Sequence, residues 1–272
     1  MRLMVRDFAV AAVFCVLAGT AQAADGLLIV QKTTSGGAPQ TNQIQIEAKR
    51  MRAESTGATG GKQIVMFDSA KQVMTLVDPE RKTYTEITQA EVEKLSAQVS
   101  GAMAQMQQQM ASLPPEQRAA IEAMMKKSGA PTGTPAKKTQ YRKVGTDTVG
   151  KWKCDKYDGY DGETKTSEIC TVDPKALGFA ATDFEISKQL AGFFRKLAPQ
   201  NADQMFTIGT PEVQGYSGVP VRQMITIAGR QITSEITEVS RQNFSDASYQ
   251  VPAGYAKTDF MGGRGRPRIP NP

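Results

Sequence analysis

The chain of 272 residues contains no histidine. Histidine is the side chain whose unperturbed pKa suits proton transfer near neutral pH, and its imidazole is the commonest transition-metal ligand in proteins. Its absence excludes catalytic triads that depend on histidine and metal sites built from imidazole. Carboxylates or a lysine can still perform acid–base chemistry, so the composition disfavours an enzyme without excluding one. We therefore expect a non-enzymatic protein without a cofactor or a bound metal.

The chain also lacks an apolar run long enough to cross a bilayer, which takes about 20 residues. The apolar run of residues 8–19 is short, follows Arg2 and Arg6, and precedes Ala21-Gln22-Ala23, whose small-x-small pattern suits a signal peptidase. Charge, apolar run and cleavage site in this order predict a signal peptide over residues 1–23, cleaved after its last residue. The alternative is a buried N-terminal helix. We expect a periplasmic protein.

Cysteine is scarce, with three in the chain. Cys15 falls in the predicted signal peptide and lacks the small preceding residues that lipid attachment requires. Cys154 and Cys170 remain, an even number in a compartment where disulfides persist. A three-residue loop at residues 161–163 sets these two cysteines directly opposite each other in a hairpin. We expect a structural disulfide, because redox pairs usually have a close Cys-x-x-Cys spacing.

Positive charge is concentrated at the C-terminus of a chain whose formal net charge is +6. We expect residues 261–272 to form a disordered basic tail. In an exported protein, Arg264, Arg266 and Arg268 suit an anionic envelope surface, or they merely aid solubility. In a cytosolic protein such a tail would suggest an RNA partner, but because we expect export we expect no nucleic-acid partner. The oligomeric state stays open.

Short β-rich segments occupy both halves of the chain. Residues 43–48 alternate apolar and polar, which is typical of a sheet with one covered face. The alternation slips between Ile46 and Met51, which predicts a bulge near Lys49 and Arg50. Short connections indicate antiparallel pairing. The predicted strands are residues 26–34, 40–54, 62–68, 72–78, 83–87, 139–144, 149–157, 164–172, 219–228 and 231–239.

Two helical regions interrupt the strands. Thr88 and Glu91 have the spacing of a capping box, in which each side chain satisfies a free backbone amide at a helix start. Apolar residues then recur three or four apart, and Pro114-Pro115 ends this helix and begins another. We predict a helical hairpin over residues 88–127, followed by a flexible connector over residues 128–137. A further helix starts near residue 182, with the apolar face Ile186, Leu190, Phe193, Phe194 and Leu197.

Methionines gather on this hairpin. Met103, Met106 and Met110 share one face of its first helix. Thioethers are soft ligands that can hold Cu(I), but they also pack irregular cores and adaptable binding surfaces. Without accompanying histidine or cysteine, the methionines favour packing, and copper binding remains as the alternative.

Several segments together resemble a known family. They are residues 26–30 (GLLIV), Phe67-Asp68, Thr83-Tyr84-Thr85, the Met/Gln-rich insertion, Cys154 with Cys170, residues 193–196 (FFRK) and residues 251–255 (VPAGY). Their order resembles exported bacterial proteins that carry domain of unknown function 4412. That family is in turn similar to the periplasmic lipoprotein-carrier (LolA-like) superfamily. The resemblance implies a curved, incomplete antiparallel barrel covered by helices over an apolar cavity, and it brings no catalytic set.

We therefore expect an α+β fold, in which one domain over residues 24–260 forms a curved antiparallel half-barrel sheet covered by inserted helices. The leading hypothesis is a non-enzymatic periplasmic protein that holds an apolar ligand, such as an acyl chain, a lipid or a lipoprotein. Candidate lining residues are Met103, Met106, Met110, Phe193 and Phe194. An ordinary closed core would use the same residues. The alternative is an envelope interaction or structural protein that binds a protein partner through the helical hairpin.

Overall fold

The computed structural model describes residues 25–56, 60–114, 116–118, 121, 139–197, 215–227 and 229–260. The predicted signal peptide, the connector and the basic tail lie outside these residues, as does most of the second helix of the predicted hairpin. Its described part, residues 116–118 and 121, is helical. The side chains of Met103 and Phe194 are likewise not among those described.

The described strands form one 12-stranded sheet in the order β12-β6-β5-β4-β3-β2-β1-β11-β10-β9-β8-β7. All neighbours are antiparallel except β12 and β6. The strands are β1 (Asp25–Thr34), β2 (Gln40–Ile46), β3 (Arg50–Thr56), β4 (Lys62–Asp68), β5 (Val73–Asp78), β6 (Thr83–Thr88), β7 (Gln140–Val149), β8 (Trp152–Asp161), β9 (Thr164–Val172), β10 (Val219–Ile227), β11 (Arg230–Asn243) and β12 (Ala256–Lys257). The helices are α1 (Gln89–Ala111) and α3 (Ala181–Leu197), with short turns η1 (Pro174–Leu177) and η2 (Asp246–Tyr249).

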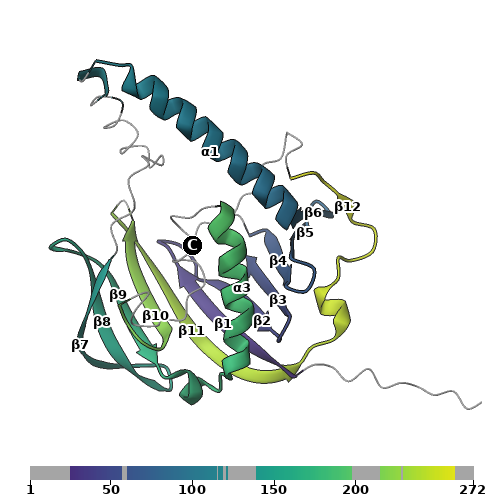
Figure 1. Cartoon of the computed structure of the whole chain (residues 1–272). Coiled ribbons are helices and arrows are strands. Elements are labelled where there is room, and N and C mark those ends of the chain that lie inside the picture. The colour runs from purple at the N-terminus through teal and green to yellow at the C-terminus, as the bar shows by residue number, and fades with distance from the viewer. Residues whose placement is uncertain are drawn as a thin grey trace, which may run out of the picture.

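Pairing between β1 and β11 joins the two halves of the sheet. Strands β1 to β6 follow one another as a meander, and β11 to β7 continue the sheet on the other side of β1. The sheet curves, α3 lies on its concave side, and α1 extends beyond the sheet (Figure 1). The structure thus confirms a large, open, mostly antiparallel sheet with a few helices.

The bulge expected at Lys49 and Arg50 is wrong, because the chain reverses there. β2 ends at Ile46, and the backbone N–H of Glu47 donates to the carbonyl of Arg50 at 2.9 Å. This tight hairpin sets Ile46 opposite Met51. The apolar alternation slips because residues on either side of a turn restart their own inward and outward pattern.

The predicted register of β8 and β9 is also wrong, although the disulfide is confirmed. Asp161 pairs with Thr164, so the turn has two residues rather than three, and an irregularity beside Gly159 shifts the pairing again. Lys156, not Cys154, therefore lies opposite Cys170. The two cysteines join diagonally across the hairpin, with an S–S distance of 2.08 Å and Cα atoms 5.4 Å apart.

The main apolar core comprises residues of α3 and of strands in both halves of the sheet, the two disulfide cysteines among them. One row of cross-strand neighbours on the concave face is at most 4% exposed, and it comprises Leu27, Ile46, Met51, Phe67, Met74 and Ile87. α3 places Ile186, Leu190 and Phe193 in the same cluster. The ring of Phe193 meets that of Phe67 edge to face, with centroids 5.6 Å apart. The apolar face of α3 thus closes this part of the sheet.

α1 starts with the predicted capping box. The backbone N–H of Glu91 donates to Thr88 Oγ1 at 3.2 Å, and the backbone N–H of Thr88 donates to Glu91 Oε2 at 2.7 Å. Val92, one turn in, is fully buried in the core. The first turn of α1 is therefore fixed to the sheet by both backbone capping and apolar burial.

Candidate binding surfaces

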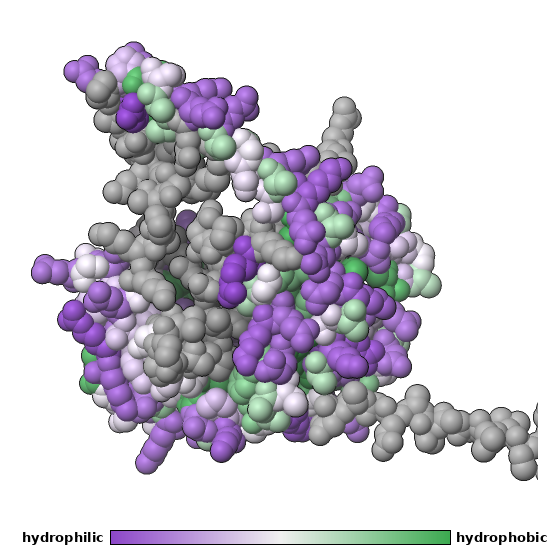
Figure 2. Space-filling model, in the orientation of Figure 1, coloured by the Kyte–Doolittle hydropathy of each residue, from purple (hydrophilic) through white to green (hydrophobic). Residues whose placement is uncertain are grey.

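The outer part of α1 is an uncharged arm. Between Leu95 and Leu113 the sequence contains no Asp, Glu, Lys or Arg, although 22% of the whole chain is charged. Most described side chains in this stretch are exposed. Figure 2 shows hydrophilic and weakly hydrophobic residues intermixed along the arm. We call residues 95–113 the α1 arm.

Arg118 fixes the far end of the α1 arm. Its Nε donates to the carbonyl of Met110 at 3.2 Å, and its Nη2 donates to the carbonyls of Ala111 and Leu113 at 3.1 and 3.3 Å. The last turn of α1 has no basic residue of its own, so Arg118 supplies the positive charge that a helix C-terminus favours. This role of Arg118 was not predicted from the sequence. Its position just after Pro114-Pro115, where the first helix is expected to end, is the feature that could have indicated it.

The described residues among the predicted lining candidates differ in burial. Phe193 is 3% exposed and belongs to the closed core, whereas Met106 and Met110 are half-buried on the α1 arm. The side chains of Met103 and Phe194 lie outside the described set. A shared apolar lining formed by these residues stays a prediction.

A second apolar surface crosses the concave face of the sheet. Ile44, Val65 and Leu76 belong to one row of cross-strand neighbours beside the buried row, and all three are half-buried while packing against the core. We call these three residues the apolar band. The described part of the chain covers the band less completely than the row next to it.

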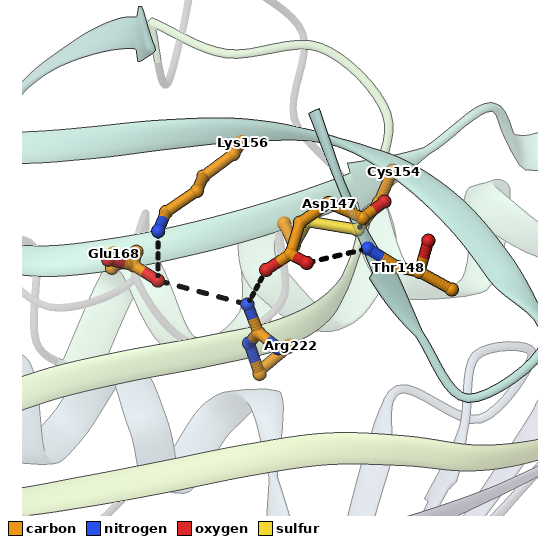
Figure 3. Close-up of a disulfide and its surroundings, with 7 residues drawn as sticks. Asp147, Thr148, Cys154, Lys156, Glu168 and Arg222 are labelled. Carbon is orange, nitrogen blue, oxygen red and sulfur yellow. Dashed lines mark hydrogen bonds and ion pairs between the residues drawn. A yellow bond between two sulfur atoms is a disulfide. The ribbon is translucent and has the colours of Figure 1, made fainter. Parts of the chain in front are cut away.

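A charged network lies beside the disulfide (Figure 3). Arg222 Nη2 lies 2.5 Å from Asp147 Oδ2 and 3.8 Å from Glu168 Oε1, and Lys156 Nζ lies 3.0 Å from Glu168 Oε1. Strand pairing sets Asp147 opposite Cys154 and sets both Lys156 and Arg222 opposite Cys170. The network therefore shares the face of the disulfide and links β7, β8, β9 and β10.

Hydrogen bonds and neighbouring positive charges in this network favour the ionised forms of Glu168 and Asp147. Burial alone would raise the pKa of Glu168, but hydrogen bonds and charge attraction from Lys156 and Lys165 outweigh it and lower that pKa. The hydrogen bond from Arg222, followed by the backbone N–H of Thr148, lowers the pKa of Asp147. A carboxyl group that donates a proton near neutral pH needs a raised pKa. These two carboxylates are instead suited to hold neighbouring strands together.

The opposite face of the same strands carries an aromatic cluster. Tyr216 packs edge to face on Tyr141 with ring centroids 4.9 Å apart, and it lies 6.2 Å from the ring of Tyr157. Ile169 is buried in the same cluster. Cross-strand pairing puts Ile169 on the face of Gln223, opposite to the charged network. The β7–β9 end of the sheet therefore carries the disulfide and the charged network on one face and the aromatic cluster on the other.

The described residues contain neither a membrane-spanning helix nor a cluster of metal-ligating side chains. None of the helices there combines the length and apolar character needed to span a membrane. Over the same described ranges, no group of three or more acidic or cysteine side chains is placed to hold a metal ion.

Comparison with known proteins gives a family and distant structural likenesses. The family model described as "Domain of unknown function (DUF4412)" matches residues 88–255. No curated protein sequence matches the chain. An uncharacterized conserved protein from Thermus thermophilus is similar at 8% identity and a TM-score of 0.42, over 87% of this chain and 91% of that one.

Two structures that contain MucB are also similar. One is MucB in complex with MucA(peri), and the other is the MucA/MucB complex of Pseudomonas aeruginosa. Each match has 10% identity and a TM-score of 0.35, over 84% and 83% of this chain respectively and 55% of the other chain. This chain therefore spans about half the length of those chains. At such scores the likeness carries no argument about function.

Proposed function

The chain belongs to the DUF4412 family, whose model covers more than half of it, and from this premise we propose an exported, non-enzymatic protein that binds a protein partner through the α1 arm. The observation that carries the proposal is the arm itself. It is anchored at both ends, it projects from the sheet, and it contains no charged residue.

An uncharged helix face suits the centre of a protein interface. Charged side chains lose their hydration when a partner covers them, and interface centres are correspondingly depleted of charge. Methionine adapts its shape to a partner, as Met106 and Met110 can on this arm. Ile121, in the helical turn that follows, is 37% exposed and adds apolar surface. The partner that fits is a neutral, partly apolar helix face lying along the arm.

The arm is long enough for such contact. At about 1.5 Å per residue, the helical stretch from Leu95 to Ala111 extends for about 25 Å. Capping by Thr88 and Arg118 holds both ends, so little helical order has to be gained on binding. Binding by an ordered helix costs less conformational entropy than binding by a segment that folds on contact.

Export is supported by two features. The N-terminal sequence has the three parts of a signal peptide, and the Cys154–Cys170 bridge is the kind of bond that persists in oxidising compartments. The missing histidine is the argument for a non-enzymatic role.

The apolar band supports a second candidate function. An acyl chain of a lipid or lipoprotein laid across Ile44, Val65 and Leu76 would complete the burial of side chains that the described residues leave half-covered. The observation that favours this candidate is the contrast between the band and the fully closed row beside it.

Site-specific photo-crosslinking in cells tests the first candidate. A photoreactive amino acid replaces exposed Gln105 or Gln109 on the arm, and Glu163 in the β8–β9 turn provides the control position. We expect one discrete adduct from the arm positions and none from the control. Adding A104K and Q108E to the arm should reduce that adduct at least tenfold, because the new charges lose hydration on binding.

Two outcomes of the same crosslinking experiment would contradict the first candidate. Equal crosslinking from the arm and from Glu163, or an adduct that survives the two added charges, contradicts partner binding through the arm.

Native mass spectrometry of the purified mature protein tests the second candidate, lipid binding on the apolar band. A co-purified acyl compound that V65D removes would favour the apolar band, whereas a clean protein mass contradicts lipid carriage.

A further inference from the structure

Both cysteines among the described residues are closed to oxidants. Cys154 and Cys170 are 4% and 1% exposed, and they are joined as a disulfide. The usual oxidisable sulfur of a redox-sensitive protein is an accessible cysteine thiolate, and a buried disulfide does not provide one. In the part of the chain that the structure describes, the sulfur atoms open to an oxidant are therefore those of methionine.

The described methionine side chains differ in exposure. Three that lie in the first half of the sheet are at most 7% exposed, namely Met51, Met66 and Met74. Met106 and Met110 are half-buried on the α1 arm, which projects from the sheet (Figure 1). Met224 of β10 is half-buried too, but it is paired with a strand on each side. The arm therefore presents its two methionines with the least protein around them.

Met106 and Met110 lie close together on one side of α1. They are four residues apart, so their side chains are neighbours on the helix surface. Ala104, Gln105 and Gln109 beside them are exposed and uncharged. An unbranched thioether on such a surface changes rotamer freely and exposes its sulfur to small solutes. A small oxidant therefore reaches both sulfur atoms without any opening of the fold.

We propose that Met106 and Met110 form a reversible oxidation site on the α1 arm, with a peroxide as the oxidant. Hydrogen peroxide transfers one oxygen atom to each sulfur: its O–O bond breaks, an S–O bond forms, the sulfur loses two electrons, and the remaining oxygen leaves as water. A dithiol reductant acting through a methionine sulfoxide reductase reverses the step. The two thiols become a disulfide, and the sulfoxide oxygen leaves as water.

Oxidation changes the arm from a partly apolar surface to a polar one. A thioether is a weak hydrogen-bond acceptor, whereas a sulfoxide is a polar group. A neutral, partly apolar partner that covers the sulfoxide removes its water without supplying a donor, which lowers affinity by about tenfold. This loss of the partner rests on the function proposed for the arm, whereas the oxidation site itself does not.

Peptide mapping of the folded protein tests the oxidation site. The purified mature protein is incubated with hydrogen peroxide, and fragmentation mass spectrometry follows the gain of oxygen at each methionine over time. We expect Met106 and Met110 to oxidise about tenfold faster than the three enclosed methionines of the sheet, and faster than Met224. In urea all of these methionines should oxidise at one rate, because unfolding exposes them equally. Equal rates in the folded protein overturn the inference.

Crosslinking from Gln105 tests the consequence for the partner. Cells that carry the photoreactive amino acid at this position are treated with hydrogen peroxide before irradiation, and the discrete adduct should fall by about tenfold. The variant M106L/M110L should keep its adduct, because leucine retains an apolar side chain of similar volume without the sulfur. The control M224L should be as sensitive to peroxide as wild type. An adduct kept by M106L/M110L alone assigns the effect to the arm rather than to sulfur atoms of the partner.

Further outcomes separate the oxidation site from the function proposed for the arm. The variant M106Q/M110Q, which places polar groups at the same positions, should lower the adduct without peroxide. An adduct that survives while mapping shows both arm methionines oxidised contradicts control of the partner by oxidation, as does an equal loss in M106L/M110L. If untreated wild type gives no adduct, the proposed function fails, and mapping by itself then decides the oxidation site.

Discussion

Arg241 in β11 donates to both carboxylate oxygens of Asp183, at 3.2 and 2.6 Å, and so ties the first turn of α3 to the sheet. The Asp183 side chain is 6% exposed and also accepts the backbone N–H of Ala180 at 2.7 Å. Arg241 lies opposite Leu27, at one end of the buried row. This pair therefore positions the helix whose apolar face closes the core.

Replacing the Asp183 carboxylate should loosen α3. We expect D183A to lower the free energy of unfolding by about 2 kcal/mol, because a buried capping group and a charge-assisted pair are lost together while Arg241 can still be hydrated. Urea denaturation measures the change. E185A, which removes an exposed pair with Lys188, is the control and should cost less than about 0.5 kcal/mol. Equal losses for the two variants would contradict the anchoring role.

The disulfide should stabilise the β8–β9 hairpin. We expect the double variant C154S/C170S to unfold with a free energy lower by about 3 kcal/mol, since the bridge closes a loop of 16 positions in the unfolded chain. Denaturation followed by Trp152 fluorescence measures this loss. Mass spectrometry of the protein purified without reductant provides the prior check, and two free thiols there would contradict a native bridge.

Phe193 and Met106 should respond differently to truncation. Phe193 is 3% exposed in the core, so F193A should cost about 3–5 kcal/mol of stability. Met106 is half-buried on the α1 arm, and M106A should cost less than about 1 kcal/mol. Chemical denaturation of both variants distinguishes a core residue from a surface residue. A small effect of F193A would favour a ligand-lining role instead.

Acid should weaken the network beside the disulfide. The pKa of Glu168 is lowered below its ordinary value of 4.5, so its contribution to stability is complete above that pH. As pH falls from 4.5 through the lowered folded-state pKa, the unfolded chain binds the proton first and the contribution is lost. The variant E168Q should be less stable at pH 7 and should lose less stability than wild type below pH 4.5. Urea melts at several pH values measure both slopes.

Several features could be predicted because neighbouring residues create them. Thr88 and Glu91 form the expected capping box, and β4 and β9 have the expected limits. The cysteine pairing also follows from a local hairpin, although its register does not. The turn and the irregularity beside Gly159 each change the pairing by one step, and the outcome depends on how the whole hairpin packs.

Other features depend on contacts between distant parts of the chain. The β1–β11 pairing joins residues about two hundred positions apart, and β12 near the C-terminus pairs with β6. Two helices with similar apolar patterns are also covered to different extents. The apolar face of α3 packs against the sheet, whereas the α1 arm extends past it. Periodicity predicts an apolar stripe on a helix but carries no information about what covers that stripe.

By itself the sequence determined that the chain has no histidine for acid–base or metal chemistry and that its N-terminus resembles a signal peptide. It also determined which segments favour strands or helices and which two cysteines are available for a bridge. These properties follow from composition and from side chains a few positions apart. Only the tertiary structure decided that Phe193 closes a core, that the α1 arm extends from the sheet, and that β12 pairs with the edge of β6. Burial and edge pairing depend on which distant surfaces meet, and that choice is made by the packing of the complete sheet.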